Sequence, residues 1–302
     1  MNSTWWAVAR SEEVSGTKPL AVDIEDQPIV LWRDAQGCAR ALEDRCPHRR
    51  APLSLGCIRK EGWIQCGYHG WSYDGETGRV REIPNLKTEQ RFSSVFRAQR
   101  FAVHEAAGFV RIAMDAETAP PQITDTDMPL SGTTHLSLEH GRYLATLFDD
   151  PSLLFTIFGV HFTSYLMSEL REQHGRLVME RSCQWKLLHW PAAFSSDYPL
   201  YARTTTDPVT GETELGLRDR DNRLLLSMIL APVPAARGVT AVRWRAKVGE
   251  GAPWPARILR RFNPVTMHQS IDGAVLRMLN PSVSSVFEKL RSSLQMAPLR
   301  AA

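Results

Sequence analysis

Two pairs of metal-binding side chains lie close together in the first quarter of this 302-residue chain. Cys46 and His48 form the first pair, with one residue between them, and Cys66 and His69 form the second, with two. Thiolates and imidazoles bind zinc and iron. All four could surround one tetrahedral zinc ion, or the cysteines could hold one iron and the histidines the other iron of a [2Fe–2S] cluster. The spacing alone leaves both sites open.

The residues that flank the two pairs favour the iron–sulfur cluster. Zinc sites usually place about two to four residues between the ligands of a pair, so a Cys-x-His pair is uncommon in them. The flanks, residues 45–49 and 67–71, resemble the Rieske domains of ring-hydroxylating and demethylating oxygenases almost residue for residue. This resemblance implies a Rieske [2Fe–2S] cluster held by Cys46, His48, Cys66 and His69. Trp71 is expected to pack against the loop that holds the cluster.

Several basic residues follow the first pair: Arg49, Arg50, Arg59 and Lys60. A positive surface of this kind would steer an acidic electron donor, a ferredoxin or a flavin reductase, toward the cluster. The alternative is a charged rim that only contacts water, which suits Arg59 and Lys60 better than Arg49. We therefore treat these residues as a candidate docking surface.

The residues around the two pairs read as short strands separated by turns. Residues 28–32 favour a strand, and a turn sequence follows at 34–37. A small all-β domain is therefore expected over residues 1–115, and the family resemblance extends over this block. A stretch rich in proline, threonine and aspartate predicts a linker at 116–132.

Residues 133–302 show a mixed pattern. Residues 152–167 are apolar enough for a buried helix. Residues 214–230 indicate a hairpin that turns at Asp221-Asn222.

Further along, apolar residues alternate over 242–248 as in a half-buried strand, and their spacing from Ile271 onward is that of an amphipathic helix. The expected class is therefore α+β. The resemblance implies a helix-grip catalytic-like domain over 133–302, in which an antiparallel sheet wraps round a long helix.

In the family that this chain resembles, the second domain holds a mononuclear iron between two histidines and one carboxylate. The resemblance aligns residues 150–152 with the start of the segment that supplies the histidines. It places Leu153 and Ile157, or Phe158, at the histidine positions. Apolar side chains have no lone pair for iron, so the sequence predicts that this chain lacks a mononuclear Fe(II) site of its own.

Two aspartates have both a functional and a structural interpretation. The resemblance implies that Asp150 bridges neighbouring subunits for electron transfer and that Asp272 is an iron ligand. Asp150 equally suits a turn before Pro151, and Asp272 equally suits the first turn of a helix capped by Ser270.

Three other histidines are candidates to replace the lost ligands. His161 would lie too far from Asp150 along a helix to share one metal ion. His189, and His268 near Asp272, could reach a site from distant parts of the chain. A histidine beside apolar residues is more often a hydrogen-bonded structural group, so rescue by these residues is the less favoured interpretation.

The composition argues against several other classes. Lys and Arg total 36 against 33 Asp and Glu, and the net charge of +3 is too small to indicate nucleic-acid binding. Outside the two pairs the cysteines are Cys38, Cys57 and Cys183, which predicts free thiols in a reducing, cytoplasmic compartment. We expect no signal peptide, and no apolar run reaches the ~18 residues of a membrane-spanning helix. Motifs for nucleotide binding or serine hydrolysis are absent from the sequence.

These residues lead to three hypotheses. The first is a Rieske oxidoreductase subunit that takes electrons from a ferredoxin or flavin reductase. It passes them to the mononuclear iron of a related subunit in a trimer-based hetero-oligomer. The second is a self-sufficient monooxygenase that hydroxylates or demethylates a small organic substrate with unconventional iron ligands, Asp272 among them. The third is a non-catalytic ligand-binding or scaffold subunit. The apolar residues Leu153 and Ile157 at the expected histidine positions favour the first hypothesis, the electron-delivering subunit.

Overall fold

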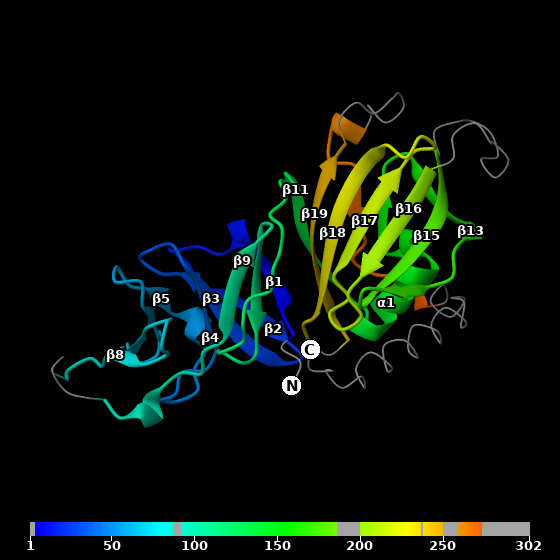
Figure 1. The fold of residues 1–302 in the computed structure, drawn as a ribbon. Coiled ribbons are helices and arrows are strands. Elements are labelled where there is room, and N and C mark those ends of the chain that lie inside the picture. The colour runs from blue at the N-terminus through cyan, green and yellow to red at the C-terminus, as the bar shows by residue number, and fades with distance from the viewer. Residues whose placement is uncertain (1–3, 87–91, 186–199, 237, 250–258, 274–302) are drawn as a thin grey trace. The chain divides into compact units, whose positions relative to one another are not determined.

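A computed structural model describes residues 4–86, 92–185, 200–236, 238–249 and 259–273 of the chain. The chain groups into two compact units, Met1–Asp127 with Val233–Arg237 and Met128–Pro232 with Gly238–Ala302 (Figure 1). None of the helices within the described ranges is long and apolar enough to cross a membrane.

The first unit is built of small antiparallel sheets. In sheet order, the strands are β1 (Trp6–Arg10), β10 (Phe109–Ala113) and β9 (Ala102–Ala106); β2 (Leu20–Ile24), β3 (Gln27–Arg33) and β4 (Ala39–Glu43); and β5 (Cys57–Ile58), β6 (Ile64–Gln65), β7 (Ser72–Tyr73) and β8 (Val80–Glu82). Short 3₁₀ turns lie at Ser11–Glu13, Leu53–Leu55 and Ser94–Phe96. The predicted all-β architecture is confirmed.

Strand β3 separates two cores of this unit. Ile29 and Leu31 belong to one hydrophobic cluster, whereas Val30 and Trp32 belong to the other. Because side chains alternate along a strand, an unbroken apolar run places residues on both faces. All four are fully buried. The second of these cores also contains both cysteines of the predicted metal site.

The predicted division into residues 1–115, a linker at 116–132 and residues 133–302 stays a prediction. Two contacts tie parts of the proposed linker to the first unit. The indole N–H of Trp5 donates to the carbonyl of Ala119 at 3.1 Å, and the main-chain N–H of Ala107 donates to the carboxylate of Asp125 at 3.0 Å.

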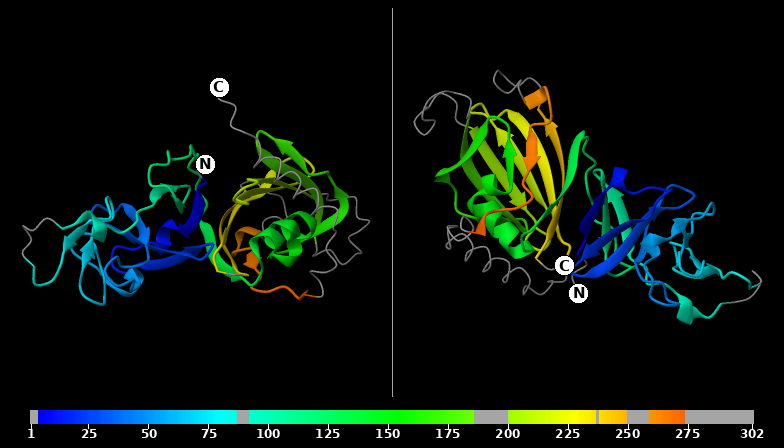
Figure 2. Two further views of the ribbon diagram at one scale, coloured as in Figure 1. Left: turned by 90° about the horizontal axis from the view of Figure 1, so that it is seen from below. Right: turned by 180° about the vertical axis from the view of Figure 1, so that it is seen from behind.

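The second unit is a curved antiparallel sheet with a helix packed against its inner face (Figure 2). Its strand order is β11 (Leu130–Leu136), β19 (Thr240–Val248), β18 (Leu224–Pro234), β17 (Thr213–Arg218), β16 (Leu200–Thr206), β15 (Arg176–Trp185) and β13 (Val160–Met167), with β14 (Arg171–Gln173) also paired to β15. The other elements are β12 (Phe155–Ile157) paired with β20 (Val265–Met267), the helix α1 (His140–Asp149) and a 3₁₀ turn at Pro151–Leu153.

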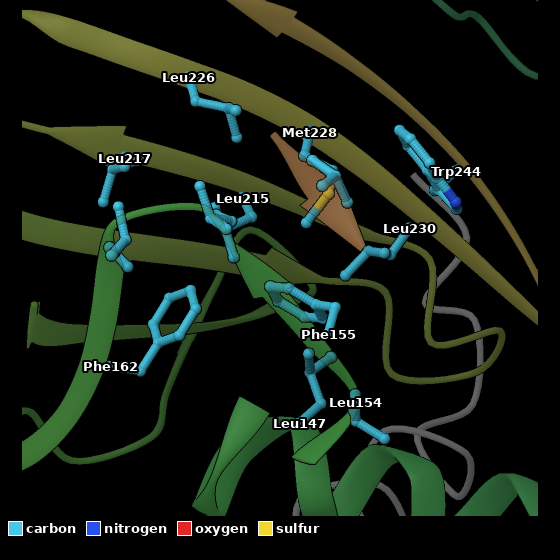
Figure 3. Packing of buried hydrophobic residues seen from close by; sticks show 14 of the residues in the cluster. Leu147, Leu154, Phe155, Phe162, Leu215, Leu217, Leu226, Met228, Leu230 and Trp244 are labelled. Atoms are coloured by element: carbon cyan, nitrogen blue, oxygen red, sulfur yellow. The ribbon is translucent and has the colours of Figure 1, made fainter. Parts of the chain in front are cut away.

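Alternating apolar residues build the core of the second unit, because every second side chain of a strand points to the same face. Leu215 and Leu217 of β17 lie opposite Met228 and Leu226 of β18. Figure 3 shows these side chains in one cluster with Leu147 of α1, and all five are at most 1% exposed. The predicted class, α+β with an antiparallel sheet wrapped on a helix, is confirmed.

The helix predicted over residues 152–167 is wrong. This stretch forms the 3₁₀ turn, β12 and β13, and α1 lies just before it. Both strands are rich in aromatic and β-branched residues, which favour a sheet, and Gly159 separates them at a φ of +75°. Helix α1 ends at Asp149 because Pro151 cannot continue it and disfavours a helical conformation at Asp150. Apolar content alone does not distinguish a buried helix from buried strands.

The other elements predicted for this unit are a hairpin, a strand and a second helix. Strands β17 and β18 form the predicted hairpin, and Asn222 in its turn adopts the left-handed conformation at φ +62°, which Asn tolerates. Residues 242–248 lie in β19 as expected. The helix predicted from Ile271 onward lies largely outside the described residues, although Ile271 itself packs partly buried against the core.

A buried arginine closes the C-terminal end of α1. Arg181 of β15 is 5% exposed and donates hydrogen bonds to the main-chain carbonyls of Asp149, at 3.0 Å, and of Phe148. Carbonyls at this end of a helix lack partners within the helix and favour a cation. Burial lowers the pKa of Arg181, and neighbouring groups that include Asp150 oppose this effect. Arg181 therefore anchors the segment that follows α1 to the sheet.

Candidate metal centre

Two loops of similar shape carry the predicted ligand pairs. The N–H of Arg50 donates to the carbonyl of Cys46 at 2.7 Å, and the N–H of Gly70 donates to the carbonyl of Cys66 at 3.0 Å. Arg50 and Gly70 both have a left-handed backbone conformation, with φ of +60° and +72°. A side chain at Gly70 would also come within 2.8 Å of Pro84. Each loop is thus a closed turn that keeps a histidine next to its cysteine.

The two thiols lie inside the first unit. Cys46 and Cys66 are each 2% exposed and belong to one core cluster. Burial raises the pKa of the Cys66 thiol and the neighbouring Cys46 raises it further, while the main-chain N–H groups of Tyr68 and His69 lower it. Two adjacent thiolates repel each other unless a cation lies between them. These surroundings fit a pair of metal-binding thiolates.

The two imidazoles lie side by side, with ring centroids 4.8 Å apart. His48 is half-buried, whereas His69 is exposed. Nδ1 of His48 is buried and has no hydrogen-bond partner among the described residues. An unpaired buried nitrogen is costly in a free imidazole but suits one that binds a metal. Burial, and then the neighbouring His69, lower the pKa of His48, which favours the neutral, metal-binding form.

Aromatic side chains pack on both imidazoles. Trp71 stacks on His48 with ring centroids 4.5 Å apart and an interplanar angle of 7°. Phe96 packs edge-on against Trp71 at 5.0 Å. The ring of Tyr68 lies 3.9 Å from that of His69. Trp71 therefore packs against the ligand loop as expected, and Phe96 and Tyr68 are supporting residues that the sequence did not single out.

Tyr73 is a further residue that sequence reasoning missed. Its hydroxyl lies 3.1 Å from the sulfur of Cys46, and the side chain is fully buried. Burial raises the pKa of Tyr73 well above its ordinary value, so the phenol keeps its proton and can donate to a thiolate. Nothing in the local pattern indicated this role, because only the fold brings β7 against the first loop.

The donor set fits a [2Fe–2S] cluster better than a zinc ion. Across the described parts of the chain, no group of three or more His, Cys, Asp or Glu side chains is placed to hold a single metal ion. A tetrahedral zinc would need all four donors round one point, whereas each iron of the cluster needs only two protein ligands. The buried thiol pair and the adjacent imidazole pair meet the second requirement.

The predicted basic residues lie in different surroundings. Arg50, Arg59 and Lys60 lie 3.0, 3.7 and 3.8 Å from glutamate carboxylates. Arg49 is exposed, and it forms no ion pair with the residues that the structure describes. The local charge of the first three is therefore partly neutralised, which leaves Arg49 as the strongest positive feature beside His48.

The second predicted site has an apolar character. Ile157 is 1% exposed and belongs to the core of the second unit, and Leu153 is half-buried in the 3₁₀ turn. Nδ1 of His268 lies 3.0 Å from the carbonyl oxygen of Leu153, so this histidine has a structural contact. The carboxylate of Asp150 accepts a hydrogen bond from the N–H of Ser152 at 3.1 Å.

The remaining candidates for that site lie apart or outside the described residues. His161 is exposed on β13, so the prediction that it lies on a helix is wrong. Asp272 is exposed near the end of the last described range, and His189 lies outside the described residues. Within the described parts of the chain, these groups do not assemble into a three-ligand iron site.

Comparison with known proteins identifies the first unit. Residues 4–99 match the family model of the Rieske [2Fe-2S] domain. The chloroplastic protein TIC 55 of Arabidopsis thaliana is 32% identical over 154 residues, which are 48% of this chain and 28% of that protein. The oxygenase component of dicamba O-demethylase from Stenotrophomonas maltophilia is 47% identical over 75 residues, 25% of this chain and 22% of that protein. These matches span less than a third of each relative.

The likeness of fold extends over both units. The crystal structure of dicamba monooxygenase bound to dicamba aligns with a TM-score of 0.71 at 19% identity, covering 98% of each chain. At this identity the likeness concerns the fold alone. The family match and the sequence relatives lead to one conclusion: this chain contains a Rieske [2Fe–2S] domain, and over that part it is homologous to Rieske ring-hydroxylating and demethylating oxygenases.

Proposed function

We propose that this chain is an electron-delivering subunit of a Rieske oxygenase. It takes one electron at a time from a ferredoxin or flavin reductase and passes each to the mononuclear iron of a related subunit. The contrast between the two units carries this proposal. The first brings two thiols and two imidazoles together, whereas the second has Leu153 and Ile157 where the family resemblance places histidines.

The residues of the first unit have distinct tasks in this proposal. Cys46 and Cys66 would hold the inner iron, and His48 and His69 the outer one. When bound, the [2Fe–2S] group supplies one-electron chemistry. The buried thiols exclude water from one side of the site, and the exposed His69 leaves the other side open to a partner. Electrons are therefore expected to enter and leave at the imidazole side.

The partner proteins follow from the same surface and from the relatives. Arg49, with Arg50, Arg59 and Lys60 around it, would attract a negatively charged ferredoxin or reductase. Two relatives are named as oxygenase subunits, of vanillate O-demethylase from a Pseudomonas species and of 3-chlorobenzoate-3,4-dioxygenase from Comamonas testosteroni. These names support a multi-subunit setting, for which we propose a trimer-based hetero-oligomer. The small organic substrate would bind to the partner subunit with the intact iron site.

We place this activity in the cytoplasm. Cys38 and Cys57 are exposed free thiols in the fold, and exposed thiols persist in reducing compartments. This location remains part of the proposal.

Metal analysis of the purified chain tests the function. Iron and acid-labile sulfide are measured per chain after anaerobic purification, followed by EPR of the dithionite-reduced protein. The proposal requires about two irons and two sulfides with a Rieske spectrum. It also requires that no further iron binds when Fe(II) is supplied. The Asp272→Ala variant is analysed in parallel.

The alternatives give different results in this experiment. A third iron that binds to the wild-type chain and is lost in Asp272→Ala would overturn the proposal in favour of a self-sufficient monooxygenase. A zinc-filled or redox-silent centre would overturn it in favour of a ligand-binding or scaffold subunit.

A further inference from the structure

The outer face of the curved sheet in the second unit carries a group of polar side chains. Strands β15, β16 and β17 lie side by side there (Figure 1). Ala202 of β16 is buried in the core, so its neighbours Tyr201 and Arg203 point to the opposite, outer face. In the strand pairing, Arg203 lies opposite Glu180 of β15, and Tyr201 lies opposite Arg218 of β17. Paired residues share one face of a sheet, so these four side chains lie on the same surface.

This surface is hollowed where the sheet meets the turn between β17 and β18. The four side chains and three residues of the turn, Asp219, Arg220 and Asn222, line a cavity of about 260 Å³. We name this cavity the outer arginine pocket, because three of the residues that line it are arginines. Tyr201 supplies an aromatic ring to the pocket and is 44% exposed, so a ligand can pack on it.

The two carboxylates of the outer arginine pocket already have cationic partners. Nη1 of Arg203 donates to the carboxylate of Glu180 at 3.4 Å. The carboxylate of Asp219, a buried residue, accepts from Nε of Arg223 at 2.9 Å and from the main-chain N–H groups of Arg223 and Asp221. Asp219 therefore shapes the turn, and its charge is balanced by an arginine that does not line the pocket.

The other two arginines of the pocket have weaker anionic partners. Nη1 of Arg218 donates to the main-chain carbonyl of Asn222 at 2.9 Å, which holds the guanidinium beside the turn. Arg218 pairs with no carboxylate among the residues that the structure describes. Nε of Arg220 lies 3.9 Å from the carboxylate of Asp221, which itself lies 3.0 Å from Nη2 of Arg223. The pocket therefore has a net positive charge that its own carboxylates do not neutralise.

Three guanidinium groups that line one hollow from two strands and a turn suit a phosphate group. A guanidinium presents its N–H donors in a planar fork that matches carboxylate and phosphate oxygens. A carboxylate has two oxygens in one plane, whereas a phosphomonoester has three outer oxygens and a charge of about −1.5 to −2 at neutral pH. A phosphate can therefore be shared by donors that approach from different sides. The hollow is smaller than the pockets of about 300–1,000 Å³ that enclose drug-sized ligands, so it fits a phosphate and a single ring.

We propose that the outer arginine pocket binds a small organic phosphomonoester. Arg203, Arg218 and Arg220 hold the phosphate oxygens, and the organic part packs on the ring of Tyr201. No covalent bond forms or breaks on binding. The inference goes beyond the proposed function and does not depend on it, because none of the lining residues belongs to the candidate metal centre.

Isothermal titration calorimetry of the purified full-length chain tests the inference. Phenyl phosphate carries both the ring and the phosphate, inorganic phosphate lacks the ring, and benzoate joins the ring to a carboxylate. Arg218→Gln removes one cation of the pocket. Arg176→Gln is the matched control, because Arg176 lies on β15, pairs with Glu214 at 3.1 Å and does not line the pocket. Circular dichroism shows whether each variant folds as the wild type does.

We expect phenyl phosphate to bind at one site per chain, more tightly than inorganic phosphate or benzoate. Arg218→Gln should weaken the binding of phenyl phosphate about tenfold, the effect of losing a charge-assisted hydrogen bond. Arg176→Gln should leave it nearly unchanged. Tyr201→Leu should weaken phenyl phosphate about threefold and leave inorganic phosphate unchanged, because it removes the aromatic contact.

Several results would overturn the inference. The first is the absence of saturable binding of phenyl phosphate at millimolar concentrations. The second is an equal affinity of Arg218→Gln and Arg176→Gln for phenyl phosphate, which would exclude a specific role for the pocket. Benzoate that binds as tightly as phenyl phosphate would indicate a carboxylate site, and inorganic phosphate that does so would indicate a site for the free anion. Either of these results rejects the organic phosphomonoester.

Discussion

The hydroxyl of Tyr73 lies 3.1 Å from the sulfur of Cys46. Both side chains lie in the core of the first unit and are almost entirely shielded from water. The phenol keeps its proton because burial raises the pKa of Tyr73, and Cys46 could only accept once it binds the metal as a thiolate. Tyr73 would therefore donate a hydrogen bond to one of the proposed cluster ligands.

Tyr73→Phe should lower the midpoint potential of the Rieske centre. Hydrogen bonds to the cluster sulfurs favour the more negative, reduced form. A difference of ~1 kcal/mol in hydrogen-bond strength between the two redox states corresponds to about 40 mV for one electron. A redox titration followed by visible absorbance or circular dichroism measures the shift. An unchanged potential with a normal EPR spectrum would show that the hydroxyl does not tune the centre.

Trp71→Ala should make the cluster labile. The variant removes the ring that stacks on His48 at 4.5 Å, and a ligand imidazole that is no longer held in place binds metal less firmly. Loss of such an outer contact typically costs about 10–100-fold in metal affinity. The rate of iron loss to a chelator provides the measurement. Trp71→Phe keeps a stacking ring and should behave nearly as the wild type; equal lability of both variants would argue against stacking as the cause.

Asp74 should stabilise the first unit in a pH-dependent way. Its carboxylate accepts hydrogen bonds from the N–H of Thr77 at 2.6 Å and from Nε of Arg81 at 2.7 Å. Burial alone would raise the pKa of Asp74, but the hydrogen bonds from Thr77 and the charge of Arg81 lower it below its ordinary value of 3.8. Because the pKa is lower in the folded state, the stabilisation is present above that ordinary value and is lost as the pH falls below it.

Asp74→Asn should accordingly lower the free energy of unfolding by about 1–2 kcal/mol at neutral pH. The difference from the wild type should shrink in acid, where the wild-type carboxylate is protonated as well. Thermal unfolding of both proteins as a function of pH tests this. A difference that stays constant across the acid range would assign the effect to the lost hydrogen-bond geometry rather than to the charge.

Arg181→Met should destabilise the second unit. The substitution keeps the apolar part of the side chain but leaves the carbonyls of Phe148 and Asp149 without their buried donor. Loss of a hydrogen bond from a charged donor costs about 1.5–3 kcal/mol. Urea unfolding followed by tryptophan fluorescence measures the loss. Arg181→Lys, which keeps a donor and a charge, should recover part of the stability, and a variant as stable as the wild type would contradict the capping role.

The local sequence pattern was sufficient to predict those parts of the structure that depend only on residues close together in the chain. The cysteine and histidine spacing indicated two similar loops that carry the predicted ligands, and each loop closes on itself within a few residues of its cysteine. The hairpin of β17 and β18 followed from alternation and from Asp221-Asn222 at its turn. The absence of histidine at Leu153 and Ile157 was also read directly from the chain.

The sequence pattern gave the wrong secondary structure where the local signals were ambiguous. Residues 152–167 are apolar in a way that suits either a helix or strands, and the tertiary structure makes them β12 and β13. The position of His161 was wrong for the same reason. The choice depends on what the segment packs against, which the segment itself does not contain.

By itself, then, the sequence determined the chemistry that is available: two thiols and two imidazoles in paired loops, and apolar residues in place of a second ligand set. Only the tertiary structure decided how that chemistry is supported. It brings Tyr73 to Cys46, stacks Trp71 on His48, and leaves Tyr68 exposed against His69. Ligand type and spacing are local properties of a chain, whereas burial, stacking and hydrogen bonding between distant residues arise from packing and exist only after folding.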